Sequence, residues 1–256
     1  MSDAMSGIAS AVEFREVTFQ HPSGRVVLSG VSFIVQEGES FALIGRSGSG
    51  KTTILKLINR LLDPSSGDVL VNGKSTRQWD VIRLRRRIGY VLQDVGLFPH
   101  LTISANVAIV PTLEGWELSR IDTRVKDVLR MVGLEPENFG SRYPHELSGG
   151  QRQRVGVARA LAADPPLLLM DEPFGALDPI TRAELQQELK HLLASLNKTM
   201  VIVTHDIPEA CVLGSSVGLV QNGKLVERLP PTKFLQSAHP EVQAVLRSLT
   251  LQNAIH

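Results

Sequence analysis

The stretch GRSGSGKTT, from Gly45 to Thr53, constrains the fold more than any other part of the chain. Three glycines and two serines stand before or beside one lysine, and such a composition cannot build an apolar core. The preceding residues, SFALI at positions 40–44, predict a buried strand, and positions 52–62 have the apolar spacing of a helix. The sequence therefore predicts a strand, a glycine loop and a helix in succession.

The loop matches the pattern G-x-x-x-x-G-K-[ST], in which each residue type serves phosphate binding. Glycines let backbone N–H groups approach anionic oxygens, and the start of a helix adds its positive dipole end. We expect Lys51 to reach the β- and γ-phosphates and the Thr52 hydroxyl to bind Mg²⁺. A chance glycine-rich turn is the alternative, which the flanking strand and helix disfavour. The predicted nucleotide-binding residues here are Gly45, Arg46, Ser47, Gly48, Ser49, Gly50, Lys51, Thr52 and Thr53.

Two acids end a second apolar run, PPLLLMDEP at positions 165–173. A short run of this kind predicts a strand buried on both faces, and parallel sheets bind ligands at the carboxyl ends of their strands. We expect Asp171 to hold Mg²⁺ and Glu172 to orient and deprotonate an attacking water as a general base. A pair of helix-capping acids is the alternative, which the glycine loop makes the weaker interpretation.

Strands alternate with helices along the chain, which predicts an α/β fold with a parallel central sheet. A hairpin is expected around Asn222-Gly223, and positions 102–163 are mostly helical, as an inserted subdomain would be. The predicted strands cover positions 12–19, 31–35, 40–44, 68–71, 88–93 and 199–204, and helices are expected at 122–132, 151–162 and 181–196. The predicted organisation is a disordered lead at 1–10, one domain at 11–238 and a short helix and tail at 239–256. Within that domain the core comprises 11–93 and 165–238, and the helical subdomain about 94–164.

Composition and charge exclude several classes of protein. Hydrophobic residues make up 43% of the chain and charged residues 21%, as in folded globular proteins. The net charge of +1 gives no general attraction to nucleic acid, so we expect no nucleic-acid partner. No apolar run approaches the roughly 18 residues that a membrane span needs, and the first ten residues lack the pattern of a signal peptide. The run RLRRR at 83–87 predicts a solvated helix face or, alternatively, a site for an anionic partner.

A second glycine-rich anion site is predicted at LSGGQ, from Leu147 to Gln151. Ser148 and the amides of Gly149 and Gly150 stand at the start of a helical run, where they could also bind phosphate. One cradle already serves one triphosphate. The economical interpretation is that this second site covers the γ-phosphate of a nucleotide held by another copy of the chain.

The order of these motifs resembles the ATP-binding subunit of an ABC transporter. GRSGSGKT, Gln93, LSGGQ, LLLMDEP, GALD and Thr204-His205 follow one another, and the resemblance covers Val12 to Leu235. It implies a P-loop NTPase core with an N-terminal antiparallel β part, ATP and Mg²⁺ as ligands, and a head-to-tail dimer of two copies.

The resemblance also assigns roles to single residues. It implies that Gln93 senses Mg²⁺ and the attacking water, and that His205 contacts the γ-phosphate, to which an imidazole can donate a hydrogen bond. It implies that Gln151 belongs to the anion site begun by Ser148, and that Asp178 contacts the opposite subunit. Gly175 in GALD stands where many members of the family have serine, a small departure.

The residues expected to contact the adenine base depart further from the family's pattern. Its members usually stack an aromatic ring on the base just after the first strand. VTFQHP places His21 at that point, with Phe19 two residues earlier as the alternative. An imidazole offers less stacking area than a phenol ring, so we expect weaker recognition of the base and intact recognition of the phosphates.

The segment QDVGLFP, from Gln93 to Pro99, is predicted to receive a transmembrane permease subunit, as the resemblance implies. Its apolar residues would form an exposed patch suited to a partner, and local packing between subdomains is the alternative. The sequences around these motifs, including RRRIGYVLQDVGLFPHLTISANVAIVP and THDIPEA, resemble those of the ATPase subunits of quaternary-amine importers. This resemblance implies uptake of glycine betaine, choline, carnitine or related osmoprotectants. It also implies that a solute-binding receptor is an indirect partner, and that the chain lies on the cytoplasmic face of the membrane.

Three other functions stay open at this point. A P-loop kinase would need an acceptor site and would lack LSGGQ. An ATP-gated assembly protein without hydrolysis would not need Glu172 and His205. An ABC subunit for another solute or for lipid is also compatible with the motifs. The chain ends at His256, so we expect no regulatory CBS pair of the kind that many quaternary-amine relatives carry.

Overall fold

A computed structural model describes residues 10–175 and 177–253 of the chain. The lead predicted at 1–10 therefore lies outside the described residues except for Ser10, and the tail beyond Asn253 lies outside them as well. Within the described part, no helix has the length and apolar character required to cross a bilayer.

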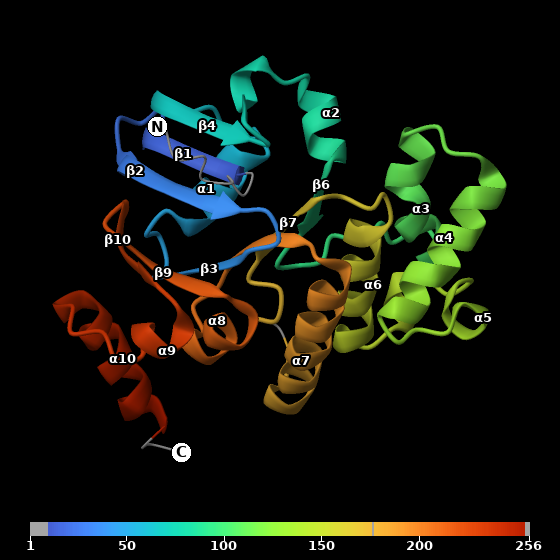
Figure 1. The fold of residues 1–256 in the computed structure, drawn as a ribbon. Helices are drawn as coiled ribbons and strands as arrows, with labels where there is room; N and C mark the ends of the chain where they lie inside the picture. The colour runs from blue at the N-terminus through green and yellow to red at the C-terminus, as the bar shows by residue number, and fades with distance from the viewer. Residues whose placement is uncertain (1–9, 176, 254–256) are drawn as a thin grey trace, which may run out of the picture.

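A six-stranded sheet forms the centre of the molecule (Figure 1). The spatial order is β10-β9-β3-β8-β7-β6, in which β10 runs antiparallel to β9 and the other neighbours are parallel. Because β3, β6, β7 and β8 all point the same way, their carboxyl ends meet at one edge. The bounds are β3 Ser40–Ile44, β6 Ile88–Val91, β7 Leu167–Asp171, β8 Thr199–Val203, β9 Ser216–Gln221 and β10 Lys224–Leu229.

A second, antiparallel sheet lies above the first in Figure 1 and has the order β2-β1-β4-β5. It includes the predicted N-terminal strand, in which Val12, Phe14, Val17 and Phe19 are buried, and the alternation is interrupted by a register shift between Phe14 and Val17. The bounds are β1 Ser10–Gln20, β2 Val26–Gln36, β4 Ser66–Val71 and β5 Lys74–Ser75. The α/β fold with a mainly parallel sheet and an antiparallel β part is confirmed.

Helices α3, α4, α5 and α6 gather on the right of Figure 1, beside the β6 edge of the central sheet, while α7 and α8 lie below it. The helix bounds are α1 Lys51–Ile58, α2 Val81–Arg86, α3 Ile103–Leu113, α4 Leu118–Met131, α5 Pro136–Phe139, α6 Gly149–Leu161, α7 Pro179–Leu196, α8 Ile207–Leu213, α9 Pro231–Phe234 and α10 Pro240–Asn253. Two 3₁₀ turns occupy Thr76–Gln78 and Pro144–Glu146.

The strand β7 is buried on both faces, as its apolar run predicts. Leu167 and Leu169 belong to the core between the two sheets, which also holds α1. Leu168 and Met170 belong to the core between the central sheet and the helices α6, α7 and α8. Alternate residues of a strand point to opposite faces, so one strand joins both cores. Because β7 is packed on both faces, the position of Asp171 at its carboxyl end is fixed.

The helix after the glycine loop ends earlier than its spacing predicts. We expected it to continue to Leu62, but α1 stops at Ile58. The Asn59 side chain accepts a hydrogen bond from the Leu61 N–H at 3.1 Å, and Arg60 takes a left-handed conformation with φ 53°. This local side-chain contact competes with the helix and turns the chain.

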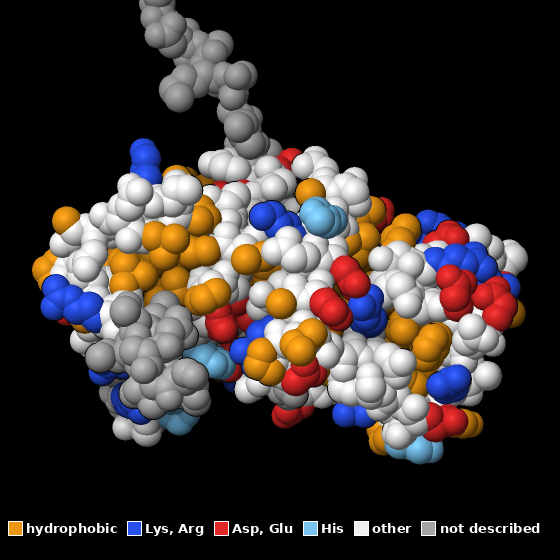
Figure 2. Space-filling model, turned by 90° about the horizontal axis from the view of Figure 1, so that it is seen from below, with side chains coloured by type: hydrophobic (Ala, Val, Ile, Leu, Met, Phe, Trp, Pro, Cys, Tyr) orange, Lys and Arg blue, Asp and Glu red, His pale blue; other side chains and the backbone are white. Residues whose placement is uncertain are grey.

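The arginine run at 83–87 is largely occupied by internal contacts. Arg85 donates to the Asn59 and Arg60 carbonyls, Arg86 pairs with Glu114, and the Arg87 guanidinium lies over the Trp79 ring. Some of the guanidinium donors are therefore used within the chain, while Arg85 and Arg87 keep their positive charge. Seen from below, basic and acidic side chains adjoin one another across the described face (Figure 2), in keeping with the net charge of +1.

Candidate nucleotide site

The glycine loop forms a backbone cradle between β3 and α1. Gly45, Gly48 and Gly50 all have positive φ, at 153°, 77° and 108°. A Cβ on Gly45 would lie 2.2 Å from the Val220 carbonyl oxygen and 2.8 Å from Ser49 Oγ, so no larger residue fits there. The loop thus depends on glycine both for its conformation and for its close packing.

The cradle leaves hydrogen-bond donors free for an anion. The N-cap of α1 is Gly50, which provides no side-chain cap, and the first turn of the helix contains no acid. The Ser49 hydroxyl is buried and has no hydrogen-bond partner within the described part of the chain. Uncapped amides at a helix start together with an unpaired buried hydroxyl fit the oxygens of a phosphate group.

Lys51 is the cation of the cradle and is 5% exposed. Its Nζ donates to the carbonyl oxygens of Gly45 at 2.7 Å and Arg46 at 3.1 Å, which holds the ammonium inside the loop. Burial lowers the pKa of Lys51, while the charges of Glu172 and Asp171 oppose that shift. The ammonium is therefore placed inside the loop, where it could also donate to phosphate oxygens.

Thr52 and Asp171 meet at the carboxyl edge of the sheet, although 119 positions separate them in sequence. The Thr52 hydroxyl donates to Asp171 Oδ1 at 3.0 Å. Burial raises the pKa of Asp171 above its usual value, and the neighbouring Glu172 charge adds to the shift. A divalent cation would favour the charged carboxylate that burial disfavours.

Thr52 and Asp171 would suit Mg²⁺ better than a metal ion whose ligands all come from protein side chains. No group of three or more His, Cys, Asp or Glu side chains within residues 10–175 and 177–253 could hold a metal ion. Mg²⁺ usually binds through one or two protein oxygens and takes its other ligands from substrate phosphates and water. One hydroxyl and one carboxylate beside a phosphate cradle match that chemistry.

The Glu172 carboxylate lies close to two other predicted site residues, His205 and Gln93. Its carboxylate oxygen Oε2 lies 3.1 Å from His205 Nδ1 and 3.5 Å from Gln93 Nε2. The Glu172 N–H donates to the Val203 carbonyl at 2.8 Å, and its φ of 46° is unusual for a residue other than glycine. A pocket holds this carboxyl and the cradle together, and its lining residues are Arg25, Val27, Ser47, Gly48, Gly50, Lys51, Thr52, Thr53 and Glu172.

Ser148 lies outside this network. It caps α6 in a reciprocal pair with Gln151, in which Ser148 Oγ accepts from the Gln151 N–H at 3.2 Å and Gln151 Oε1 accepts from the Ser148 N–H at 2.9 Å. No hydrogen bond of the described residues joins this motif to the cradle. Ser148 is exposed, and its O–H remains available as a donor.

Comparisons with known proteins agree with this geometry. Residues 28–175 match the family model described as ABC transporter. The chain belongs to the ABC transporter family.

Individual relatives carry transport functions in their names. The chain is 46% identical over 226 residues to the glycine betaine/carnitine/choline transport ATP-binding protein OpuCA of Bacillus subtilis, covering 88% of this chain and 59% of that protein. It is 52% identical over 200 residues to the glycine betaine uptake system ATP-binding protein YehX of Escherichia coli, covering 78% of this chain and 65% of that protein. The chain thus spans less than two thirds of the length of these relatives.

A solved structure supports the fold of this ABC family member. The ATP-binding cassette MJ0796, a dimer in a post-hydrolysis state bound to ADP and Pi, superimposes with a TM-score of 0.77 at 35% identity. The match covers 86% of this chain and 98% of that one.

Asp178 and the second glycine motif of this ABC chain lie near the start of α7. Asp178 is the N-cap of α7 and accepts from the Thr181 N–H at 3.1 Å, a contact that lowers the pKa of its carboxyl. A Cβ on Gly150 would lie 2.8 Å from Thr181 Cγ2, so α6 approaches α7 closely only because this residue is glycine. The two segments expected to face a second copy are therefore adjacent in one chain.

The two candidates for adenine stacking differ in exposure. Phe19 is 8% exposed and belongs to the core between the sheets, so its ring is not free to meet a base. His21 is exposed, and its Nδ1 lies 2.9 Å from Ser23 Oγ. His21 stays the predicted adenine partner. Arg25 and Val27, which sequence reasoning missed, line the phosphate pocket from the turn and strand that follow.

The segment from Gln93 to Pro99 is held in an unusual conformation. Val95 has φ 54°, which is rare for a β-branched residue, and its carbonyl accepts from Arg159. The buried Asn106 side chain donates to the Phe98 carbonyl at 3.1 Å and accepts from the Phe98 N–H at 2.8 Å. Phe98 itself is 46% exposed beside a pocket lined by Tyr90, Ile109, Val110 and Arg159, among others.

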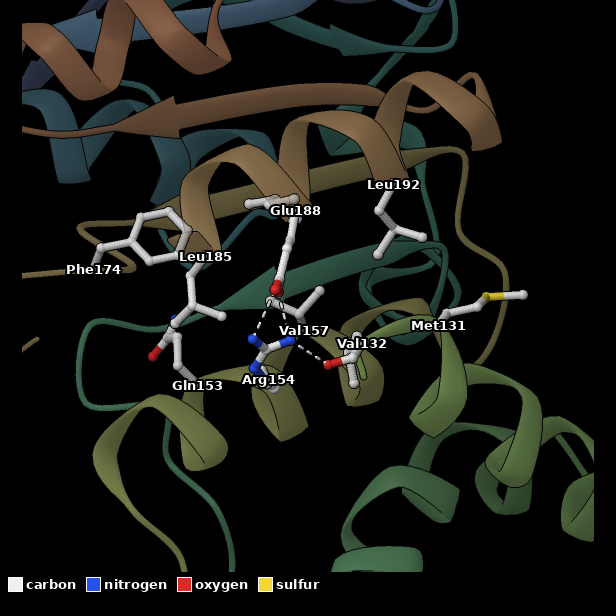
Figure 3. Close-up of a pocket in the computed structure, with 10 residues that line it drawn as sticks. Met131, Val132, Gln153, Arg154, Val157, Phe174, Leu185, Glu188 and Leu192 are labelled. Carbon is white, nitrogen blue, oxygen red and sulfur yellow. Dashed lines mark hydrogen bonds and ion pairs between the residues drawn. The ribbon is translucent and has the colours of Figure 1, made fainter. Parts of the chain in front are cut away.

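A largely apolar pocket lies between α6 and α7 and near the end of α4 (Figure 3). Arg154 spans it, donating to the Val132 carbonyl at 2.7 Å and to Glu188 Oε1 at 3.0 Å. Its apolar lining, which includes Phe174 and Leu192, does not suit phosphates. Within this pocket, Arg154 and Glu188 form a polar link between α6 and α7.

Proposed function

We propose that this chain is the ATP-hydrolysing subunit of an ABC importer, and that two copies bind two MgATP at their interface. The observation that carries the proposal is the network around Glu172. A carboxylate that contacts both His205 and Gln93 lies in the same pocket as the phosphate cradle. This arrangement provides a base and side chains that could contact the γ-phosphate.

Each chain residue then has a distinct task. Lys51 and the amides of the loop bind the phosphates, and Thr52 and Asp171 would hold Mg²⁺, which neutralises charge on the phosphates when bound. Glu172 accepts a proton from the attacking water, and His205 donates to the γ-phosphate. Gln93, which contacts the Glu172 carboxylate, orients the same water.

The site is completed by a second copy. Ser148 is exposed and outside the bonded network of its own chain, and its O–H is free to donate to the γ-phosphate held by the partner. Each triphosphate would join two donor sites that otherwise face water, which provides the closing force. Asp178 at the start of α7 would contact the partner in the same closure.

The test is the substitution Glu172→Gln, which keeps the size of the side chain and one acceptor oxygen but removes the base. ATP should then convert the chain to a stable dimer on size exclusion with light scattering, with turnover reduced by at least about 100-fold. A variant that stays monomeric with ATP and hydrolyses it normally would refute the assignment of the base.

Transport of a quaternary amine is the second part of the proposal. Its support is the similarity to proteins named for glycine betaine, carnitine and choline transport or uptake. The permease would bind at the segment Gln93–Pro99, where Phe98 is exposed beside the groove lined by Tyr90 and Arg159. The solute receptor would act only through that permease, and the chain would lie on the cytoplasmic face of the membrane.

This part needs its own experiment. The chain should be reconstituted with its permease in liposomes, and the ATPase rate measured with the receptor and glycine betaine. Stimulation by glycine betaine and not by an uncharged amino acid supports the proposal. Stimulation by a lipid or by an unrelated solute would instead assign the subunit to another ABC system.

A further inference from the structure

Two helices begin beside the candidate site, each within two residues of a predicted site residue. α7 begins after Asp178, and α8 begins at Ile207, two residues after His205. Asp206 is the N-cap of α8: its Oδ1 accepts from the Glu209 N–H at 2.8 Å, and its own N–H donates to Thr204 Oγ1 at 3.0 Å. The backbone that carries His205 is therefore fixed by the start of α8.

Arg182 joins the two helix starts. Its Nη2 donates to the Leu177 carbonyl at 3.0 Å, and its Nη1 lies 3.5 Å from Asp206 Oδ2. Both side chains of this ion pair are about three-quarters buried, at 27% and 26% exposure. A planar guanidinium with two separate partners transmits a displacement of one partner to the other better than a flexible ammonium would.

A second, buried contact reinforces this link one helical turn further along α7. Gln186 Nε2 donates to Glu209 Oε2 at 3.3 Å, and the two residues are 7% and 3% exposed. The other carboxyl oxygen, Glu209 Oε1, is buried and has no hydrogen-bond partner among the described residues. The buried contact between Gln186 and Glu209 holds one relative placement of α7 and α8, because breaking it leaves further unpaired groups.

The other side of α7 is joined to α6. Glu188 on α7 accepts from Arg154 on α6, as Figure 3 shows. α6 begins at the motif of Ser148, which serves the partner's nucleotide in the proposed dimer. α7 thus contacts both the helix that serves the partner's site and the helix that places His205 in its own site.

We propose that Arg182 is a positioning residue that couples docking of a second copy at Leu177 and Asp178 to the placement of His205 against Glu172. The inference rests on the proposed function. Docking at the start of α7 is transmitted through Arg182 to Asp206, and it restricts movement of His205 away from its 3.1 Å contact with Glu172. Hydrolysis is in this way confined to the closed dimer, and the two ATP sites become cooperative.

The test compares Arg182→Met and Asp206→Asn with wild type in steady-state ATP hydrolysis. Asparagine caps a helix as well as aspartate does, so Asp206→Asn keeps the start of α8 and removes only the charge. We expect kcat to fall at least tenfold in both variants, KM to stay within twofold, and the Hill coefficient for ATP to approach 1. The double variant should be no slower than either single one, because both remove the same link.

Arg124→Met is the matched control. Arg124 is 21% exposed, donates to the Ala162 and Leu161 carbonyls and pairs with Asp164, away from the nucleotide pocket. It should lose similar thermal stability and keep the wild-type kcat and Hill coefficient. Variants Arg182→Met and Asp206→Asn that match this control would overturn the coupling role. Wild-type protein without ATP turnover would overturn the proposed function as well, which distinguishes the two failures.

Discussion

The buried carboxyl of Glu209 gives a prediction whose size follows from the structure. Its ordinary pKa of 4.5 is raised to about 8, first by burial and then by the nearby Asp206 charge, against the opposing effects of Thr204, Arg182 and Gln186. The folded chain therefore keeps this proton over a range of pH in which the unfolded chain releases it. The substitution Glu209→Gln mimics the protonated side chain.

The sign follows from proton linkage. Stabilisation from the protonated carboxyl is complete below pH 4.5, decreases as pH rises, and stops decreasing above about pH 8. Each pH unit in that window costs about 1.4 kcal/mol, so wild type should lose roughly 2 to 3 kcal/mol from this group between pH 6 and pH 9. The glutamine variant has no such proton and should lose nothing from this position.

The assay is urea unfolding of both proteins at pH 6 and pH 9. Groups that titrate in both proteins cancel in the comparison, so the variant should gain roughly 2 to 3 kcal/mol on wild type between the two pH values. Glu184→Gln, an exposed carboxyl on α7, is the control and should change the unfolding free energy by less than about 0.5 kcal/mol at either pH. An equal difference between wild type and Glu209→Gln at both pH values would refute the reasoning.

Three further predictions concern the nucleotide site. Lys51→Met should abolish MgATP binding in calorimetry, because the buried ammonium is the cation of the cradle; binding within twofold of wild type would contradict this. Gly45→Ala should lower the unfolding free energy by about 1 to 3 kcal/mol and abolish ATP binding, since its Cβ would meet the Val220 carbonyl; unchanged melting would count against it. His21→Tyr should tighten ATP binding about two- to fivefold through a larger stacking area, and an unchanged Kd would exclude position 21 from the adenine site.

Much of the site could be predicted because short motifs carry their own structural context. The apolar run before Asp171 predicts a strand buried on both faces, and β7 contributes to both cores. The glycine loop between a predicted strand and a predicted helix is found between β3 and α1. These features depend on neighbours in sequence, which a pattern can register.

Contacts between distant segments could not be predicted in the same way. Nothing in the pattern around Arg182 or Glu209 indicates that α7 and α8 meet there, because the burial of each depends on the packing of the other helix. α8 itself is only seven residues long, too short for a periodic signal, although Asp206 with a following proline and Glu209 marks a helix start. The early end of α1 likewise depends on the Asn59 side chain and not on apolar spacing.

The central claim is that one chain holds an incomplete catalytic pocket, which the Ser148 motif of a second copy completes. Specific ATPase activity of the purified wild-type chain, measured at saturating MgATP over a range of protein concentrations, tests this most directly. The account predicts that activity per chain falls steeply on dilution below the dimerisation constant, and that Ser148→Arg removes it at every concentration. Activity per chain that stays constant while light scattering shows only monomer would contradict the account.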